Sequence, residues 1–295
     1  MRRLWLTILL FLCSPVWSQT LVASVEPLAK VLRSLYGPEV EILTLMEANQ
    51  NPHQLALSPR QVLNVQQADL VVWLGEAAEP PLTSLLARRD KPSLAVLDLP
   101  GVQRRETGGH PHAHDEADHH DGAEHGAHEN AWLDPHLWLS VDNMRLLAAT
   151  LGERFPAGMQ AQQPAAWQQA TQDWLARQQA AFAPFREAPW LSYHHPWGYL
   201  TDSVDLAEPL VVTEQLDAGP GSRRFVSLAE AIREQQVRCA IQEPEARANL
   251  LKRLCPDCYV QPLDPLGRDY PELDYLPWLT GLAEGLRQCL KAASQ

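Results

Sequence analysis

Short apolar runs rich in β-branched residues alternate along this chain with amphipathic stretches, and the whole pattern occurs twice. The predicted strands cover residues 21–25, 39–45, 69–75 and 93–99 in the first half, and residues 190–194, 209–213, 237–243 and 258–263 in the second. Strands that alternate with helices at this spacing are typical of parallel α/β units. The chain is therefore predicted to be an α/β protein with two small doubly wound α/β lobes.

A single long helix is predicted between the two halves. Residues 163–185 place Trp167, Trp174 and Phe182 at helical spacings among alanine, glutamine and arginine. A helix of about 20 residues extends some 30 Å, enough to join two lobes as one rigid element, although an ordinary helix within one domain fits the same pattern. The predicted domains are an N-terminal lobe over residues 19–162, a linking helix over 163–187 and a C-terminal lobe over 188–295.

The N-terminus has the features of an export signal. Arg2 and Arg3 precede the apolar run of residues 4–12, and Ser18 ends a stretch acceptable to a signal peptidase. Residues 1–18 are thus a predicted signal peptide, and we expect a periplasmic protein. The apolar run is shorter than the roughly 20 residues that a bilayer requires. Cys13 leaves a lipid-anchored form as an alternative, which we rank lower because Leu12 before it is larger than lipidation signals prefer.

The charge and the cysteines limit the function further. The formal net charge is -12, and loss of the two arginines with the signal brings it to -14. No basic stripe follows a nucleic-acid backbone, so we expect no nucleic-acid partner, and we expect a monomer. Four cysteines in an exported chain predict disulfides with three possible pairings, and the favoured one joins Cys239 to Cys289 and Cys255 to Cys258. A redox motif or half of a zinc site is the alternative for the second pair.

Seven of the eleven histidines lie in one acidic stretch without large apolar residues, at residues 108–128. They are His110, His112, His114, His119, His120, His125 and His128. Imidazole and carboxylate groups are metal ligands, so the stretch is predicted to be an accessory metal-collecting loop. An acidic loop without a metal function is the alternative.

The other histidines all follow predicted strands. His53 follows the second strand, His136 follows the histidine-rich stretch, and His194 with His195 ends the fifth strand. Asp264 follows the last strand. Ligands of open α/β sheets bind beyond the carboxyl ends of strands, and three imidazoles with one carboxylate suit tetrahedral zinc. A metal site in the cleft between the lobes is the resulting prediction.

Several segments resemble a known family. Residues 51–75, 130–145, 192–200, 241–251 and 262–267 look like the metal receptors of ABC importers, most closely the ZnuA-like zinc receptors. The resemblance covers essentially the whole mature chain, with its segments in the family's order. It implies two α/β lobes bridged by one long helix with the metal between them. It also implies that Zn²⁺ is the transported ligand and that the partner is a permease in the inner membrane.

The resemblance assigns the metal ligands to His53, His136, His194 and Asp264. Many relatives have His-Asp where this chain has His194-His195, so either imidazole could be the third ligand. We favour His194, because it directly follows the aromatic Tyr193 as the family ligand does. Manganese receptors of the family have a carboxylate at this third position, whereas imidazole favours zinc. Glu243 matches another family signature and is interpreted as a supporting group, not a ligand.

Two other functions are compatible with a zinc-binding exported chain. A secreted zinc hydrolase would need a general base and an open coordination position. The sequence contains neither HExxH nor GxSxG, so we predict that the protein is not an enzyme. A zinc-buffering or adhesin-type surface protein is the second alternative, because a surface that docks on a permease leaves no motif here.

Overall fold

The computed structural model describes residues 19–46, 57–107, 132–213, 221–268 and 270–293. The predicted signal peptide, His53 and the histidine-rich stretch 108–128 lie outside these residues. No helix in the described ranges is long and apolar enough to cross a membrane.

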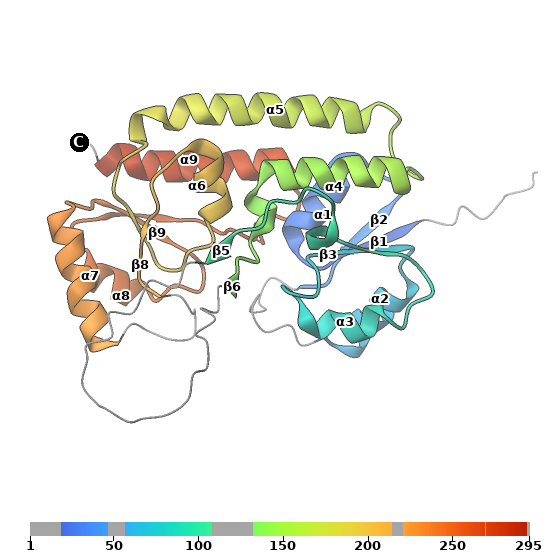
Figure 1. The fold of residues 1–295 in the computed structure, drawn as a ribbon, viewed down its shortest axis with the longest axis horizontal. Coiled ribbons are helices and arrows are strands. Elements are labelled where there is room, and N and C mark those ends of the chain that lie inside the picture. The colour runs from blue at the N-terminus through green and yellow to red at the C-terminus, as the bar shows by residue number, and fades with distance from the viewer. Residues whose placement is uncertain (1–18, 47–56, 108–131, 214–220, 269, 294–295) are drawn as a thin grey trace, which may run out of the picture.

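The chain forms two α/β lobes, each built on a four-stranded parallel sheet (Figure 1). The first sheet has the order β2-β1-β3-β4, with β1 (Thr20–Ala23), β2 (Glu41–Thr44), β3 (Leu70–Trp73) and β4 (Ser93–Ala95). The second has the order β10-β9-β7-β8, with β7 (Leu191–Ser192), β8 (Leu210–Val211), β9 (Cys239–Gln242) and β10 (Tyr259–Pro262). All eight predicted strands are present, each shorter than predicted, and the predicted fold class is confirmed.

Helices cover both faces of each sheet. In the N-terminal lobe they are α1 (Glu26–Leu35), α2 (Pro59–Gln67), α3 (Pro80–Leu86), η1 (Val96–Asp98), η2 (Leu137–Leu139) and α4 (Val141–Arg154). In the C-terminal lobe they are α6 (Gly198–Val204), α7 (Ser222–Glu234), α8 (Ala248–Leu254) and α9 (Tyr275–Ala293).

The sequence at the start of α2 explains why this helix begins at Pro59. The Ser58 side chain accepts from the backbone N–H of Gln61, whose own side chain accepts from the backbone N–H of Ser58.

The predicted long helix is α5 (Gln163–Phe182), which continues as a short 3₁₀ turn, η3 (Ala183–Phe185). Figure 1 shows α5 running above both lobes, with α9 directly below it. Its buried face carries Trp167 and Trp174, and the indole N–H of Trp174 donates to the Thr280 hydroxyl of α9 at 2.9 Å. The helix therefore bridges the lobes as predicted.

A continuous apolar core connects the lobes. One cluster of buried side chains includes Leu21 from β1, Ile241 from β9, and Leu279 from α9. Successive residues of a strand point to opposite faces, so Val22 joins a separate small core under α2 and α3. Burial of each large aliphatic side chain contributes about 1.5–3 kcal/mol. Moving the lobes apart would expose several of them, so the frame around the space between the lobes is stiff.

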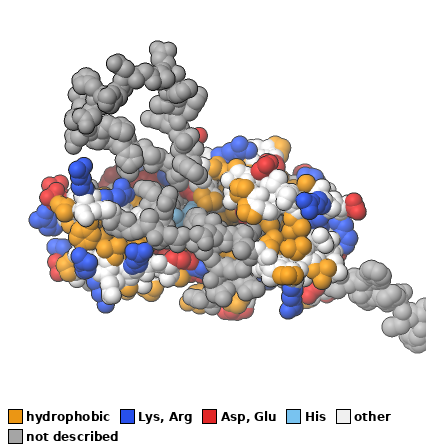
Figure 2. Space-filling view, turned by 90° about the horizontal axis from the view of Figure 1, so that it is seen from below, with side chains coloured by type: hydrophobic (Ala, Val, Ile, Leu, Met, Phe, Trp, Pro, Cys, Tyr) orange, Lys and Arg blue, Asp and Glu red, His pale blue; other side chains and the backbone are white. Residues whose placement is uncertain are grey.

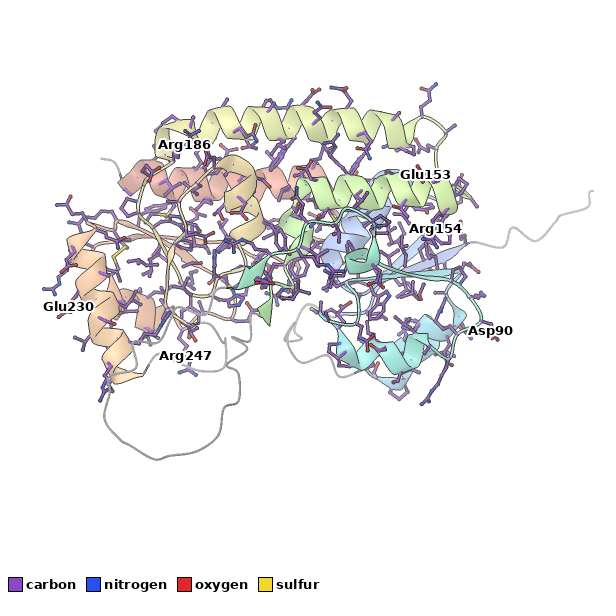
Figure 3. All side chains as sticks on the ribbon, viewed as in Figure 1. Asp90, Glu153, Arg154, Arg186, Glu230 and Arg247 are labelled. Atoms are coloured by element: carbon purple, nitrogen blue, oxygen red, sulfur yellow. A yellow bond between two sulfur atoms is a disulfide. The ribbon has the colours of Figure 1, made fainter. Side chains whose placement is uncertain are left out.

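Both predicted disulfides are present in the C-terminal lobe (Figure 3). Cys239 of β9 is bonded to Cys289 of α9, and Cys255 is bonded to Cys258 directly after α8. The first bond joins the sheet to the helix that packs on it. The second commits both cysteines of the CPDC motif to each other, so neither thiol is a zinc ligand in this structure.

A small antiparallel hairpin at the junction of the lobes was not predicted. It pairs β5 (Glu106–Thr107) with β6 (Trp132–Leu133), and Figure 1 shows both between the two sheets. The hairpin flanks the histidine-rich stretch on both sides in the sequence. It places the chain that follows β6, including His136, between the lobes.

Candidate metal centre

His136 and His194 lie next to each other where the two lobes meet. Their ring centroids are 5.2 Å apart, with an angle of 63° between the ring planes. His136 follows β6 from the N-terminal lobe, and His194 follows β7 from the C-terminal lobe. Both residues are buried, with 5% and 8% of their surfaces exposed, and Figure 2 shows histidine atoms in the middle of the molecule. Because zinc–nitrogen bonds are about 2.0–2.1 Å long, two imidazoles at this separation can bind one ion.

The His136 ring is oriented by Asp134. One carboxylate oxygen, Oδ1, lies 2.7 Å from His136 Nδ1 and also accepts from the His136 backbone N–H at 3.0 Å. A carboxylate at Nδ1 places the proton on that nitrogen, so His136 would coordinate a metal through Nε2. On another side the Trp138 ring packs edge-on at 5.2 Å, held by a hydrogen bond from its indole N–H to the Pro265 carbonyl.

Glu243 supports the segment that carries His194. Its Oε1 accepts from the Ser192 hydroxyl at 2.7 Å and from the Trp197 indole N–H at 3.1 Å, and its Oε2 accepts from the His194 backbone N–H at 3.4 Å. Burial raises the pKa of Glu243 to about 7, although these hydrogen bonds lower it. The Glu243 carboxylate thus contacts the backbone of His194, and all the hydrogen-bond donors to this carboxylate belong to the C-terminal lobe.

The neighbouring histidine makes a different contact. His195 Nε2 lies against the carboxylate of Glu208, which lies just before β8. The His194 ring lies next to the His136 ring, whereas the His195 ring lies against Glu208.

Asp264 follows β10 as predicted, but both of its oxygens have strong partners. Oδ1 accepts from the Leu266 backbone N–H and pairs with Arg268 Nη2 at 3.0 Å, and Oδ2 accepts from the Arg268 backbone N–H at 2.6 Å. Arg268 also pairs with Glu245. Over the described residues, no three histidine, cysteine, aspartate or glutamate side chains come close enough to hold a metal. The structure brings together His136 and His194, does not add Asp264 to them, and does not describe His53.

Sequence reasoning missed Asp134 as the partner of His136. The signal was present, because a carboxylate two residues before a histidine in a turn can reach the ring of that histidine. Such a spacing also occurs in many turns without a metal. Only the burial of Asp134, which is 0% exposed, distinguishes this pair from an ordinary turn contact.

Comparison with known proteins identifies the family. The family model described as zinc-uptake complex component A periplasmic, or ZnuA, matches residues 21–289. The chain belongs to the ZnuA family. It is 29% identical to the high-affinity zinc uptake system protein ZnuA of Paracoccus denitrificans, over 89% of this chain and 88% of that protein. It is 24% identical to the ZnuA of Haemophilus ducreyi, over 98% and 99% of the two chains.

Solved structures share the fold of this ZnuA-family chain. A crystal structure of ZnuA superposes with a TM-score of 0.74 at 19% identity, covering 92% of this chain and 99% of the other. The laminin-binding protein Lmb of Streptococcus agalactiae, described as an adhesin with metal-transporting activity, has the same TM-score at 16% identity, with the same coverage. These likenesses confirm two lobes bridged by a long helix.

Proposed function

We propose that this ZnuA-family chain captures Zn²⁺ in the periplasm and delivers it to an ABC-type permease in the inner membrane. The observation that carries the proposal is the pair of buried imidazoles, His136 and His194, one from each lobe. Relatives named high-affinity zinc uptake system proteins match nearly the whole chain, which supports zinc as the cargo. The protein would act as a monomer, free of a lipid anchor after loss of residues 1–18, and as a binding protein without catalysis.

The proposed ligands are the imidazoles of His53, His136 and His194, with the carboxylate of Asp264 as the fourth. A site rich in nitrogen favours zinc over manganese, which prefers oxygen ligands. Asp264 would have to give up its contacts with Arg268 to reach an ion, so we expect it to contribute less than the imidazoles. The seven histidines of residues 108–128 are proposed to hold further ions as an accessory.

Burial and the supporting carboxylate explain how this site would bind its cargo. Side chains from both lobes exclude water from His136 and His194, which strengthens electrostatic contacts with a cation. The imidazoles must be neutral to coordinate, so zinc competes with protons and its affinity should fall at acidic pH. Asp134 would orient the ring of His136 and make its metal-binding nitrogen a better donor.

Chelator competition with zinc and with manganese tests the proposal. We expect the mature chain to bind zinc far more tightly, and His136→Ala and His194→Ala to weaken binding by more than about 100-fold, beyond the range typical for supporting groups. His195→Ala is the comparison variant, because it removes an adjacent imidazole that faces Glu208, and it should weaken zinc binding far less than either ligand variant.

Deleting residues 108–128 separates the accessory stretch from the proposed primary site. The deletion should keep the tight site and lose only weaker ions, as counted by calorimetry. Loss of the tight site on deletion, or unchanged affinity in His136→Ala and His194→Ala, would show that zinc is not held between the lobes.

A further inference from the structure

Arg105 is the centre of an ion-pair network that joins the two lobes. It lies just before β5, in the segment that leaves the N-terminal lobe. Its Nε donates to the Asp202 carboxylate of α6 at 3.0 Å, and its Nη2 pairs with Glu208 before β8. Burial would lower the pKa of Arg105, but Asp202 and Glu208 outweigh it and raise the pKa. One cation of the N-terminal half thus binds two carboxylates of the C-terminal half.

The backbone around Arg105 is built to hold it in this position. Its N–H donates to the Tyr199 hydroxyl at 2.9 Å, and its carbonyl accepts from the Asp134 N–H at 2.8 Å. The Tyr199 hydroxyl donates in turn to the Asp134 carbonyl at 3.2 Å. The guanidinium lies against the start of α6, because a Cβ added to Gly198 would be 2.1 Å from Arg105 Nη1. A side chain at Gly198 would therefore displace the guanidinium.

The network reaches the candidate ligands at both ends. Arg105 Nη1 lies 4.0 Å from Oδ2 of Asp134, whose Oδ1 holds the His136 ring. Asp134 is 0% exposed, and its Oδ2 has no hydrogen-bond partner within the described ranges. At the other end, Glu208 pairs with His195, the residue after His194. Contacts therefore run from the ring of one ligand, through Arg105, to the segment of the other.

We propose that Arg105 is a positioning residue for the zinc site, one that sets the spacing of His136 and His194 and balances the charge of Asp134. The inference rests on the proposed zinc function. Exposed ion pairs generally contribute little, but Arg105 is only 20% exposed at its side chain and faces a fully buried carboxylate. Without the guanidinium, Asp134, Asp202 and Glu208 would be left as neighbouring negative charges. Their repulsion would loosen the junction and let bound zinc leave faster.

The test measures zinc dissociation from full-length mature variants by stopped-flow mixing with a chelator. Arg105→Gln should raise the dissociation rate by about 10- to 100-fold, the range for loss of a supporting group at a metal ligand. Arg105→Lys should restore only part of this, because a single ammonium cannot match the fork of the guanidinium. Gly198→Ala, which keeps the arginine but displaces its guanidinium, should change the rate in the same direction.

A matched control and a spectroscopic readout separate positioning from general stability. Arg145→Gln removes a partly exposed arginine of α4, whose Nη1 lies 3.1 Å from the Asp142 carboxylate. The zinc dissociation rate of this variant should be unchanged. The visible spectrum of the Co²⁺-loaded protein reports the ligand geometry, and it should change in Arg105→Gln but not in Arg145→Gln.

The outcomes distinguish the two levels of the proposal. If Arg105→Gln lowers only the melting temperature and leaves the dissociation rate and Co²⁺ spectrum as in the wild type, Arg105 is a structural brace and the inference is wrong. If Arg105→Gln does not fold, Gly198→Ala decides on the same criteria. If the wild type itself does not bind zinc tightly, the proposed function fails and the positioning role with it.

Discussion

The buried carboxyl group of Glu79 should make the stability of this protein depend on pH. Glu79 precedes α3, is 7% exposed, and its Oε2 accepts from the Leu74 backbone N–H at 2.7 Å, at the end of β3. Burial raises its pKa from 4.5 to about 7, although the hydrogen bond from Leu74 lowers it. Glu79→Gln keeps an oxygen that can accept from Leu74 but removes the ionisation.

The sign and size of the effect follow from proton linkage. Between pH 4.5 and 7 the folded protein binds the Glu79 proton and the unfolded chain does not. The stability from this group is therefore fully present below pH 4.5 and is lost as the pH rises through 7. With these two pKa values, the loss between pH 5 and pH 8 is on the order of 2–3 kcal/mol. Glu79→Gln has no such group to ionise, so between pH 5 and pH 8 its free energy of unfolding should rise by this amount relative to that of the wild type.

Urea denaturation of the zinc-free protein at pH 5, 6, 7 and 8 measures the effect. Because burial also raises the pKa of Glu243 to about 7, only the difference between wild type and variant isolates Glu79. Glu76→Gln is the matched control for the loss of one glutamate, since Glu76 is exposed three residues earlier. A difference between wild type and Glu79→Gln that stays the same from pH 5 to pH 8 would refute the reasoning.

Two further predictions concern the disulfides and the ligand support. Serine at Cys239 and Cys289 should lower the free energy of unfolding by about 4 kcal/mol, because the bond spans 50 residues. The same change at Cys255 and Cys258, which are three residues apart, should cost about 1.5 kcal/mol. Equal shifts of the urea midpoint would contradict a loop-closure origin. Asp134→Asn, which removes the charge beside the His136 ring, should weaken zinc binding about 10- to 100-fold in chelator competition, and unchanged affinity would contradict a supporting role.

The central strands were the most predictable because they are apolar runs covered on both faces, as in Leu70–Trp73, where all four residues are buried. The long helix was predictable because Trp167 and Trp174 mark its buried side. The hairpin of β5 and β6 was not, since Glu106 and Thr107 of β5 are polar and the two strands are separated by the histidine-rich stretch. Their pairing depends on tertiary contacts that a local pattern does not contain.

The candidate site was predictable only in part. Histidines after strands indicated which residues could converge, and His136 and His194 do lie together. The charged residues around these histidines were not predictable, because their partners are far away in the sequence. Glu208, for example, lies 103 residues from Arg105. Asp264 and Arg268, four residues apart, form an ion pair that the sequence analysis did not consider, and the role of Asp264 as a fourth ligand stays a prediction.

The continuous core has a consequence for how zinc would be held. Leu21, Ile241 and Leu279 belong to one cluster that spans the lobes. Lys30 of α1, which is fully buried, donates to the Leu273 carbonyl just before α9 at 3.2 Å. A wide hinge motion would break these contacts, so the core limits how far the lobes can separate around His136 and His194. Because the imidazoles are positioned before the ion arrives, zinc affinity should depend on the groups that orient them more than on movement of the lobes.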